Sequence, residues 1–169
     1  MPDHSFPFHA ESSALAHATV DRVFAYLDDP KALAAHMGES SMMMMGSRMS
    51  IDVDADGGRV VGSRIRMQGS MMGISLSLEE AITERQVPYK KIWETIGTPD
   101  LKVMAHYRMG FELTPKGDSS LVRVFVDYSL PTRVPTSWLG RLFGGAYARW
   151  CTKQMADDAA RHFNSTRST

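Results

Sequence analysis

The spacing of hydrophobic residues changes along the chain, and each spacing predicts a different kind of element. A first strand is predicted over about residues 8–18. Apolar residues then recur at helical spacing over Val20–Leu27, which indicates a short amphipathic helix with Thr19 as its N-cap. Asp29 is the expected N-cap of a second short helix that stops at Gly38. The chain therefore begins with a strand and two short helices.

Alternating apolar and polar positions replace the helical spacing from about residue 48 to Leu130. Such alternation is typical of antiparallel strands with one buried and one wet face. In the clearest example, Val103 to Leu113, most odd-numbered residues form an apolar face, while Met104 and His106 lie on the other face. A turn is predicted at residues 97–100. The predicted strands cover about residues 48–53, 61–68, 74–87, 90–96, 103–113 and 122–130.

A long final helix is predicted from Thr136 to about Phe163. Glycines at 140, 144 and 145 weaken its first half, at roughly 1 kcal/mol each relative to Ala, so we expect a kink or a separate short helix there. Strands segregated from helices predict an α+β fold with an antiparallel sheet of about seven strands. Only the final helix is long enough to cover the sheet. Its predicted apolar stripe consists of Leu139, Leu142, Phe143, Ala146, Trp150, Met155, Ala159 and Phe163.

Length and charge limit the classes of protein that this sequence fits. The 169 residues are expected to form a single domain over residues 1–169, with a core at about 8–163. Nineteen basic residues balance nineteen acidic ones, which argues against a nucleic-acid-binding protein. Residues 1–8 do not resemble a signal peptide, and no apolar run approaches the roughly 18 residues of a membrane-spanning helix. We therefore expect a cytoplasmic protein that does not span a membrane.

The residues that usually hold cofactors or metals do not occur at the spacings such sites need. The sequence contains neither His-x-x-x-His nor Cys-x-x-Cys, and no phosphate-binding glycine loop or Gly-x-Ser-x-Gly motif. We therefore expect no metal and no cofactor. The single cysteine, Cys151, cannot form an internal disulfide, and we interpret it as a buried, inert thiol on the final helix.

Methionine is unusually frequent, with thirteen residues, four of them consecutive from Met42 to Met45. Methionine is flexible and polarisable, so it suits a surface that adapts to a ligand, although core filling is the simpler explanation for each residue. The run from Met42 to Met45 indicates either a flap or a partner-binding patch, with a buried edge strand as the alternative. The expected ligand-contacting residues, besides two tyrosines, are His36, Met37, Met44, Met67, Met109, Phe111 and Trp150.

Three polar residues of the predicted strands are candidates for chemistry in the interior. Tyr107 and Tyr128 lie on apolar faces, where their hydroxyls would bond either a ligand oxygen or a protein group. Glu80 shares the parity of Leu78 and Ile82, so a regular strand would point it inward as a candidate acid or base. Because an unpaired buried carboxylate is costly, we expect instead a β-bulge near Glu79 that turns both glutamates outward.

Three segments together resemble the SRPBCC or START-like superfamily, which includes polyketide cyclase-like proteins and birch-pollen-type allergens. They are the Val-x-x-Val-Phe-Ala-Tyr-Leu-Asp-Asp-Pro stretch over Val20–Pro30, the strand–proline–strand junction over Glu84–Trp93, and the closing helix from Trp138, with Tyr147-Ala-Arg-Trp150. The resemblance implies a helix-grip fold, with a curved sheet around the C-terminal helix and a cavity between them. The superfamily has no universal catalytic residue, so none is transferred to this chain.

Three functions fit this resemblance, and fold alone does not choose among them. The first is binding of a hydrophobic small molecule, of lipid, polyketide or aromatic type, in the cavity. The second is a cyclase or dehydratase acting on such a ligand, with Glu80 as the candidate acid–base group. The third is a protein-interaction regulator that uses the Met42–Met45 surface, and a homodimer is also conceivable. We favour the first, because the sequence offers residues suited to a cavity and no convincing catalytic set.

Overall fold

The computed structural model describes residues 5–33, 48–71, 74–101, 104–131 and 137–165. Its helices are α1 (Val20–Leu27), α2 (Pro30–Leu33) and α3 (Ser137–Asn164). Its strands are β1 (Phe8–Ala16), β2 (Arg48–Val53), β3 (Arg64–Met71), β4 (Ile74–Gln86), β5 (Lys90–Asp100), β6 (Tyr107–Lys116) and β7 (Ser119–Tyr128). The predicted order of a strand, two short helices, further strands and a long helix is confirmed.

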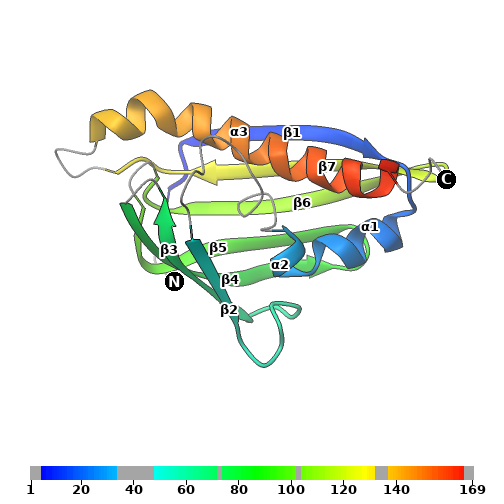
Figure 1. The fold of residues 1–169 in the computed structure, drawn as a ribbon, viewed down its shortest axis with the longest axis horizontal. Coiled ribbons are helices and arrows are strands. Elements are labelled where there is room, and N and C mark those ends of the chain that lie inside the picture. Colours follow the sequence, from blue (N-terminus) through cyan, green and yellow to red (C-terminus); the bar gives the residue numbers. More distant parts are fainter. Residues whose placement is uncertain (1–4, 34–47, 72–73, 102–103, 132–136, 166–169) are drawn as a thin grey trace.

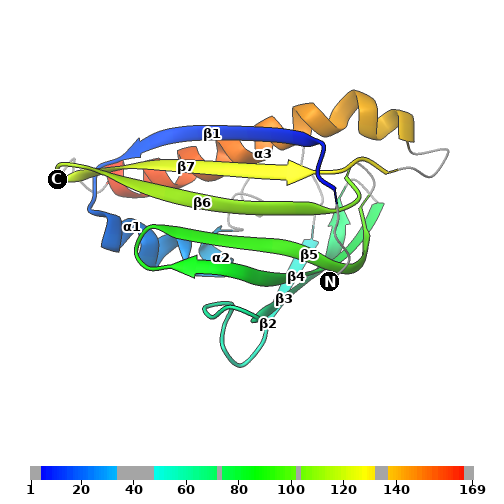
Figure 2. The same ribbon diagram turned by 180° about the vertical axis from the view of Figure 1, so that it is seen from behind.

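The seven strands form one antiparallel sheet in the order β1-β7-β6-β5-β4-β3-β2. Consecutive strands from β2 to β7 are neighbours, and β1 joins the far edge beside β7. Helix α3 lies along β1 and β7, and α1 packs near β6 and β7, so both helices cover the same face of the sheet (Figure 1). We call this the inner face. Figure 2 views the outer face, with α3 behind the strands.

The two short helices begin where the sequence predicts. Thr19 precedes α1 in an extended conformation, although its side chain makes no capping hydrogen bond. Asp29 does cap α2, because its Oδ1 accepts a hydrogen bond from the Lys31 amide at 2.9 Å. The apolar face of α1, formed by Val23, Phe24 and Leu27, is buried against the sheet.

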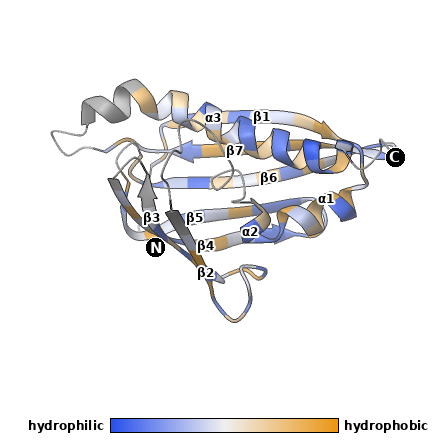
Figure 3. Ribbon diagram, in the orientation of Figure 1, coloured by the Kyte–Doolittle hydropathy of each residue, from blue (hydrophilic) through white to orange (hydrophobic). Residues whose placement is uncertain are grey.

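The core lies between the inner face of the sheet and the helices. Hydrophobic and hydrophilic residues both occur within long strands such as β5 and β6 (Figure 3), as expected where side chains alternate between a buried and an exposed face. Ser12 of β1 and Thr152 of α3 add a hydrogen bond of 3.2 Å between sheet and helix. The core includes Ala10, Ala16, Val23, Phe24, Leu27, Ile82, Trp93, Met109, Phe111, Leu113, Val122, Val124, Val126, Ala148, Met155, Ala156, Ala159 and Phe163.

A buried ionic cluster ties the end of α1 to strands β4 and β5. Lys91 Nζ donates to the carbonyl oxygen and to Oδ1 of Asp28, both at 2.8 Å. Arg85 Nη2 donates to Asp28 Oδ2, also at 2.8 Å. Burial alone would raise the pKa of Asp28, but hydrogen bonds from Arg85 and Lys91 outweigh it and hold the pKa below its ordinary value. The cluster therefore fixes α1 on the sheet through charge as well as apolar contact.

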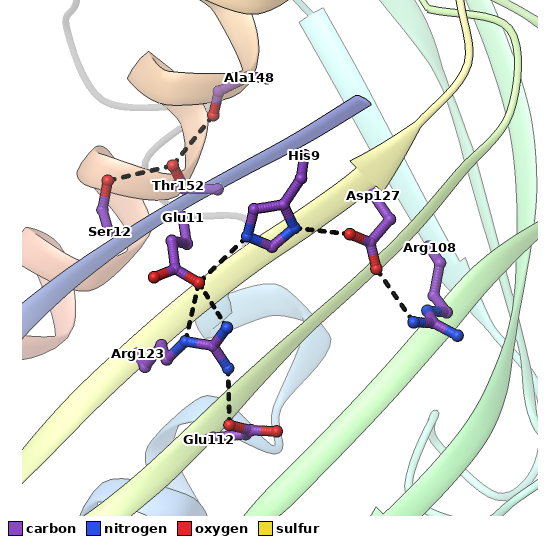
Figure 4. Close-up of polar contacts among 9 residues, drawn as sticks. All are labelled: His9, Glu11, Ser12, Arg108, Glu112, Arg123, Asp127, Ala148 and Thr152. Carbon is purple, nitrogen blue, oxygen red and sulfur yellow. Dashed lines mark hydrogen bonds and ion pairs between the residues drawn. The ribbon is translucent and has the colours of Figure 1, made fainter. Parts of the chain in front are cut away.

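The outer face carries a network of charged side chains across β1, β7 and β6, which we call the outer network (Figure 4). His9 lies between Asp127, at 2.6 Å, and Glu11, at 3.1 Å. Arg123 joins Glu11 to Glu112, and Arg108 bonds the second oxygen of Asp127. Opposite charges side by side on neighbouring strands explain why this face stays polar.

Three predicted details of the strands are wrong. Strand β5 continues to Asp100 through the predicted turn, because Gly97 adopts a positive φ and the register with β4 shifts there. Strand β6 begins only at Tyr107, so the residues before it do not alternate, and Met104 is buried. Val61 lies in the loop before β3 and is exposed.

The final helix also differs from its prediction. Helix α3 is continuous from Ser137 to Asn164, and there is no separate short helix at the glycines. Phe143 and Ala146 are exposed, whereas Ala148, Thr152 and Ala156 are fully buried. Met155, Ala159 and Phe163 are buried as predicted, and small residues add to the buried stripe because α3 packs closely on β1 and β7.

Candidate functional site

The register of the sheet aligns polar and aromatic residues in one row across the inner face. Phe8 of β1 pairs with Tyr128 of β7, which pairs with Tyr107 of β6. Thr95 of β5 accepts a hydrogen bond from the Tyr107 amide at 3.1 Å and pairs with Glu80 of β4. These five residues from five strands form what we call the inner row. The two tyrosines predicted from sequence are therefore direct cross-strand neighbours.

Glu80 is the most deeply enclosed member of the inner row. It is 1% exposed, and its Oε1 accepts a short hydrogen bond from the Tyr107 hydroxyl. The Trp93 side chain, whose only donor is its indole N–H, also hydrogen-bonds Glu80. Burial raises the pKa of Glu80 to about 7, although both hydrogen bonds and the charge of Lys91 act to lower it. A carboxyl group in this state exchanges its proton near neutral pH.

Helix α3 contributes two further groups above the inner row. Tyr147 and Cys151 lie one helical turn apart, and both influence the Tyr107 hydroxyl electrostatically. Burial raises the pKa of the Cys151 thiol to about 12, so it stays protonated at neutral pH, and Glu80 contributes to this shift. Among the described residues, the Tyr147 hydroxyl has no hydrogen-bond partner. The space between β4, β6 and α3 therefore contains several polar groups within an apolar core.

Tyr128, between Phe8 and Tyr107 in the inner row, lies near the first half of α3. It is 4% exposed, and its ring stacks on Phe8 with the centroids 5.5 Å apart. A Cβ added to Gly145 would lie 3.4 Å from the Tyr128 hydroxyl and 3.5 Å from Arg149 Nη1. A side chain at position 145 would therefore contact this hydroxyl.

The predicted β-bulge exists, but its expected effect on Glu80 is wrong. The register between β4 and β5 shifts between Ser77 and Glu79, as a bulge requires. The extra residues lie on β5, so β4 keeps its alternation and Glu80 points inward with Leu78 and Ile82. Glu79 does face outward, where it pairs with Arg64 and Arg66. Hydrogen bonds from Tyr107 and Trp93 offset the cost of burying Glu80.

The other predicted ligand-contacting residues lie in different parts of the structure. Phe111 is fully buried and packs on Phe24, 5.6 Å away between centroids, at the α1 end of the core. Met109 is buried two residues from Tyr107, and Met67 is partly buried against the core. Trp150 is partly buried and its ring lies 5.9 Å from that of Tyr147. His36, Met37 and Met44, with the rest of the Met42–Met45 run, lie outside the described residues.

Sequence reasoning missed Trp93, Thr95 and Tyr147. Lys91, Trp93 and Thr95 alternate along the strand, and the lysine among them hides the apolar signal of that face, which is buried in the structure. Tyr147 lies off the predicted apolar stripe, which in this part of α3 was traced through the exposed Phe143 and Ala146. Among the described residues, no His, Cys, Asp or Glu side chains gather in a group of three that would suit a metal ion.

The sequence matches no protein-family model and no curated protein. Solved structures do share the fold. The aromatase/cyclase Zhui from a Streptomyces species has a TM-score of 0.71 at 12% identity, over 95% of this chain and 96% of that chain. Truncated norcoclaurine synthase from Thalictrum flavum has a TM-score of 0.65 at 16% identity, over 92% of each chain. A START superfamily protein from Mycobacterium smegmatis has a TM-score of 0.60 at 16% identity, over 94% and 98%.

At these identities the likeness concerns the fold alone. The chain has the helix-grip fold of the SRPBCC or START-like superfamily, as its sequence resemblance implied. Within the described part of the chain, the helices are too short or too polar to cross a membrane.

Proposed function

We propose that this protein binds a hydrophobic small molecule between the inner face of the sheet and α3. The observation that carries the proposal is the inner row, a set of polar and aromatic side chains inside an otherwise apolar core. Ligand sites in proteins are mostly apolar with a few convergent polar groups. Glu80, Tyr107 and Tyr147 bring such groups together from two strands and a helix.

The polar groups of this region would orient the ligand. The Tyr107 hydroxyl donates its proton to Glu80 and keeps its lone pairs for a second partner. The Tyr147 and Tyr128 hydroxyls have no hydrogen-bond partner among the described residues, so each can bond a ligand oxygen or nitrogen. Met109 and Met67 supply adaptable apolar surface near the row. The ligand is therefore expected to be of lipid, polyketide or aromatic type, with a polar group at one end.

Native mass spectrometry of the purified protein tests this proposal, with Gly145→Leu as the blocking variant. A leucine at Gly145 would press against the Tyr128 hydroxyl and the Arg149 guanidinium, since even a Cβ there lies 3.4 Å and 3.5 Å from them, and circular dichroism checks that the variant is folded. Ala146→Leu is the matched control, because Ala146 is exposed on the same helix. We expect a non-covalent adduct in the wild type and in Ala146→Leu, and its loss in Gly145→Leu. If Gly145→Leu and Ala146→Leu carry equal amounts of adduct, the proposal is contradicted. It is also contradicted if the wild type forms no adduct, even after incubation with aromatic and fatty probes.

A second candidate is an enzyme of cyclase or dehydratase type, favoured by the state of Glu80. General acid–base catalysis works best when the pKa of the catalytic group lies near the working pH, and the pKa of Glu80 is about 7. Turnover of an aromatic polyketide would then fall by at least about 100-fold in Glu80→Gln, the usual scale of a lost acid–base group. If Glu79→Gln on the outer face lowers turnover as much, Glu80 has no special role.

A further inference from the structure

Glu80 differs from the other buried carboxyl group in lacking a cation. Asp28 is contacted by Lys91 and Arg85, whereas no Lys, Arg or His among the described residues forms an ion pair with Glu80. Lys91 is the basic residue whose charge reaches Glu80, but its ammonium group donates to Asp28. The interior thus contains a carboxyl group for which the described part of the chain supplies no counter-ion.

The hydrogen bonds around Glu80 nevertheless favour its ionised form. Both Tyr107 and Trp93 act as donors to it, and donors stabilise a carboxylate more than a neutral acid. What the site lacks is therefore a positive charge rather than further donors. A ligand that brings that charge would complete the environment of a carboxylate.

Two aromatic residues contact this carboxyl group, Trp93 from β5 and Tyr107 from β6. A third aromatic residue, Tyr147 of α3, influences the Tyr107 hydroxyl electrostatically. The faces of Trp and Tyr rings attract cations, most strongly where water is excluded. A buried acid among aromatic rings matches a protonated amine attached to an apolar body.

We propose that the ligand is a hydrophobic amine whose ammonium group pairs with Glu80. This inference rests on the proposed function, since it places the amine at the inner row of the same site. The apolar body of the amine lies between the sheet and α3, and the ammonium group takes the position next to Glu80 that the described residues leave without a cation. Neutral and anionic ligands of the same shape bind more weakly.

The titration of Glu80 makes this preference depend on pH. The titratable and charged groups around it are Lys91 on β5, Tyr107 on β6, and Tyr147 and Cys151 on α3, while its partner on β3 is the apolar Ile65. Tyr107, Tyr147 and Cys151 stay protonated at neutral pH because burial raises their pKa values. Glu80 is thus the group in this set that changes charge near pH 7, and an ammonium ligand must displace its proton below that pH.

Matched naphthalene probes test the inference by fluorescence titration. They are 2-naphthylmethylamine, 2-naphthalenemethanol and 2-naphthoate, which share the apolar body and differ in charge. At about pH 8 we expect the amine to bind the wild type at least about tenfold more tightly than the alcohol, the ratio for a shift of one pKa unit. The ratio should shrink as the pH falls to about 6, because the proton on Glu80 then competes with the amine.

Two variants test whether Glu80 causes the preference for the amine over the alcohol. Glu80→Gln should bind amine and alcohol with similar affinity, while Glu79→Gln, the neighbouring carboxylate on the outer face, should keep the wild-type ratio. Circular dichroism establishes that both variants are folded. Because the wild-type ratio and its pH dependence need no variant, the test stands even if Glu80→Gln does not fold.

The possible failures are distinguishable. If the alcohol or the naphthoate binds the wild type as tightly as the amine, the amine inference falls while the proposed binding function stands. A ratio that survives in a folded Glu80→Gln variant also overturns the inference, because the charge is then recognised elsewhere. If none of the probes binds, both the inference and the proposed function are contradicted.

Discussion

Two buried carboxyl groups in this molecule have opposite surroundings. Asp28, at the end of α1, contacts Lys91 and Arg85, and its pKa lies below the ordinary value. Glu80, on the inner row, has hydroxyl and indole donors but no cation among the described residues, and its pKa is raised to about 7. Both side chains are less than a tenth exposed, so burial alone does not explain the difference.

The comparison indicates that the partners decide what a buried acid can do. A carboxylate held between two cations is fixed in charge across the neutral range, so it serves to join α1 to the sheet. A carboxyl group without a counter-ion changes charge with small changes in pH or with the arrival of a ligand. Asp28 therefore stabilises the fold, whereas Glu80 is available for function.

The largest effect is expected from removing the charge of Asp28. Asp28→Asn leaves the fully buried Lys91 ammonium without its counter-ion, so the free energy of unfolding should fall by about 3–5 kcal/mol. Denaturant titration at neutral pH measures this loss. The double variant Asp28→Asn with Lys91→Met should recover most of it, because the unpaired buried charge is then gone. A loss well below 1 kcal/mol in the single variant would contradict a stabilising role for the cluster.

The pH dependence of stability should have opposite signs at the two acids. Between its ordinary pKa of 4.5 and about 7, Glu80 holds a proton in the folded protein that the unfolded chain has released. Its contribution to stability is therefore full at low pH and declines as the pH rises through this window, by on the order of 3 kcal/mol. The lowered pKa of Asp28 gives stability that is present above its ordinary pKa of 3.8 and is lost in more acidic solution.

Glu80→Gln isolates the first of these windows. As the pH rises from about 4.5 to 7, the glutamine variant should gain stability relative to the wild type, because it carries no proton to lose. Urea titrations of both proteins at several pH values measure the difference. If the free energy of unfolding depends on pH in the same way in both proteins, Glu80 does not titrate in this range.

A smaller change is expected from Tyr107→Phe. It removes one donor to Glu80, so the pKa of Glu80 should rise further, and the free energy of unfolding should fall by about 1–2 kcal/mol. Carbon-13 NMR of the carboxyl groups follows the titration directly. Tyr89→Phe is the matched control, because Tyr89 is half exposed and should leave both quantities unchanged. An unaltered Glu80 titration in Tyr107→Phe would contradict the hydrogen bond.

The smallest effects are expected in the outer network. The side chains of His9, Glu11 and Arg123 are each more than a third exposed, so solvent screens their attraction. Arg123→Ala should lower the free energy of unfolding by at most about 1 kcal/mol, less than Asp28→Asn does. Repeating the measurement in high salt should shrink even this difference. A loss above about 3 kcal/mol would mean that the network is coupled more tightly than exposed ion pairs usually are.

The fold could be predicted because local patterns and burial agree along most of the chain. Val122, Val124 and Val126 alternate with polar residues and are buried as the period predicts. The same alternation placed Tyr107 and Tyr128 on the inner face, where the register makes them neighbours. That pairing follows from hairpins formed between consecutive strands, so sequence order alone was a good guide to it.

The state of Glu80 could not be predicted in the same way. The bulge that was expected to turn it outward lies on the partner strand, and sequence does not reveal which strand carries the extra residues. Its donors come from Trp93 and Tyr107, on two other strands, so the cost of burial cannot be judged from β4 alone. The inward stripe of α3 was predicted correctly at Met155 and Phe163 but not at Phe143, because close packing on β1 and β7 favours small residues such as Ala148 and Ala156.

The pairing of β1 with β7 has a consequence for how the molecule assembles. More than a hundred residues separate the paired positions, whereas the strands from β2 to β7 can join as successive hairpins. Closing so long a loop is entropically costly, and topologies of this kind fold slowly. During translation, β1 emerges from the ribosome early and remains unpaired until β7 has been synthesised. A chaperone that shields this early edge would therefore raise the yield of native protein during translation.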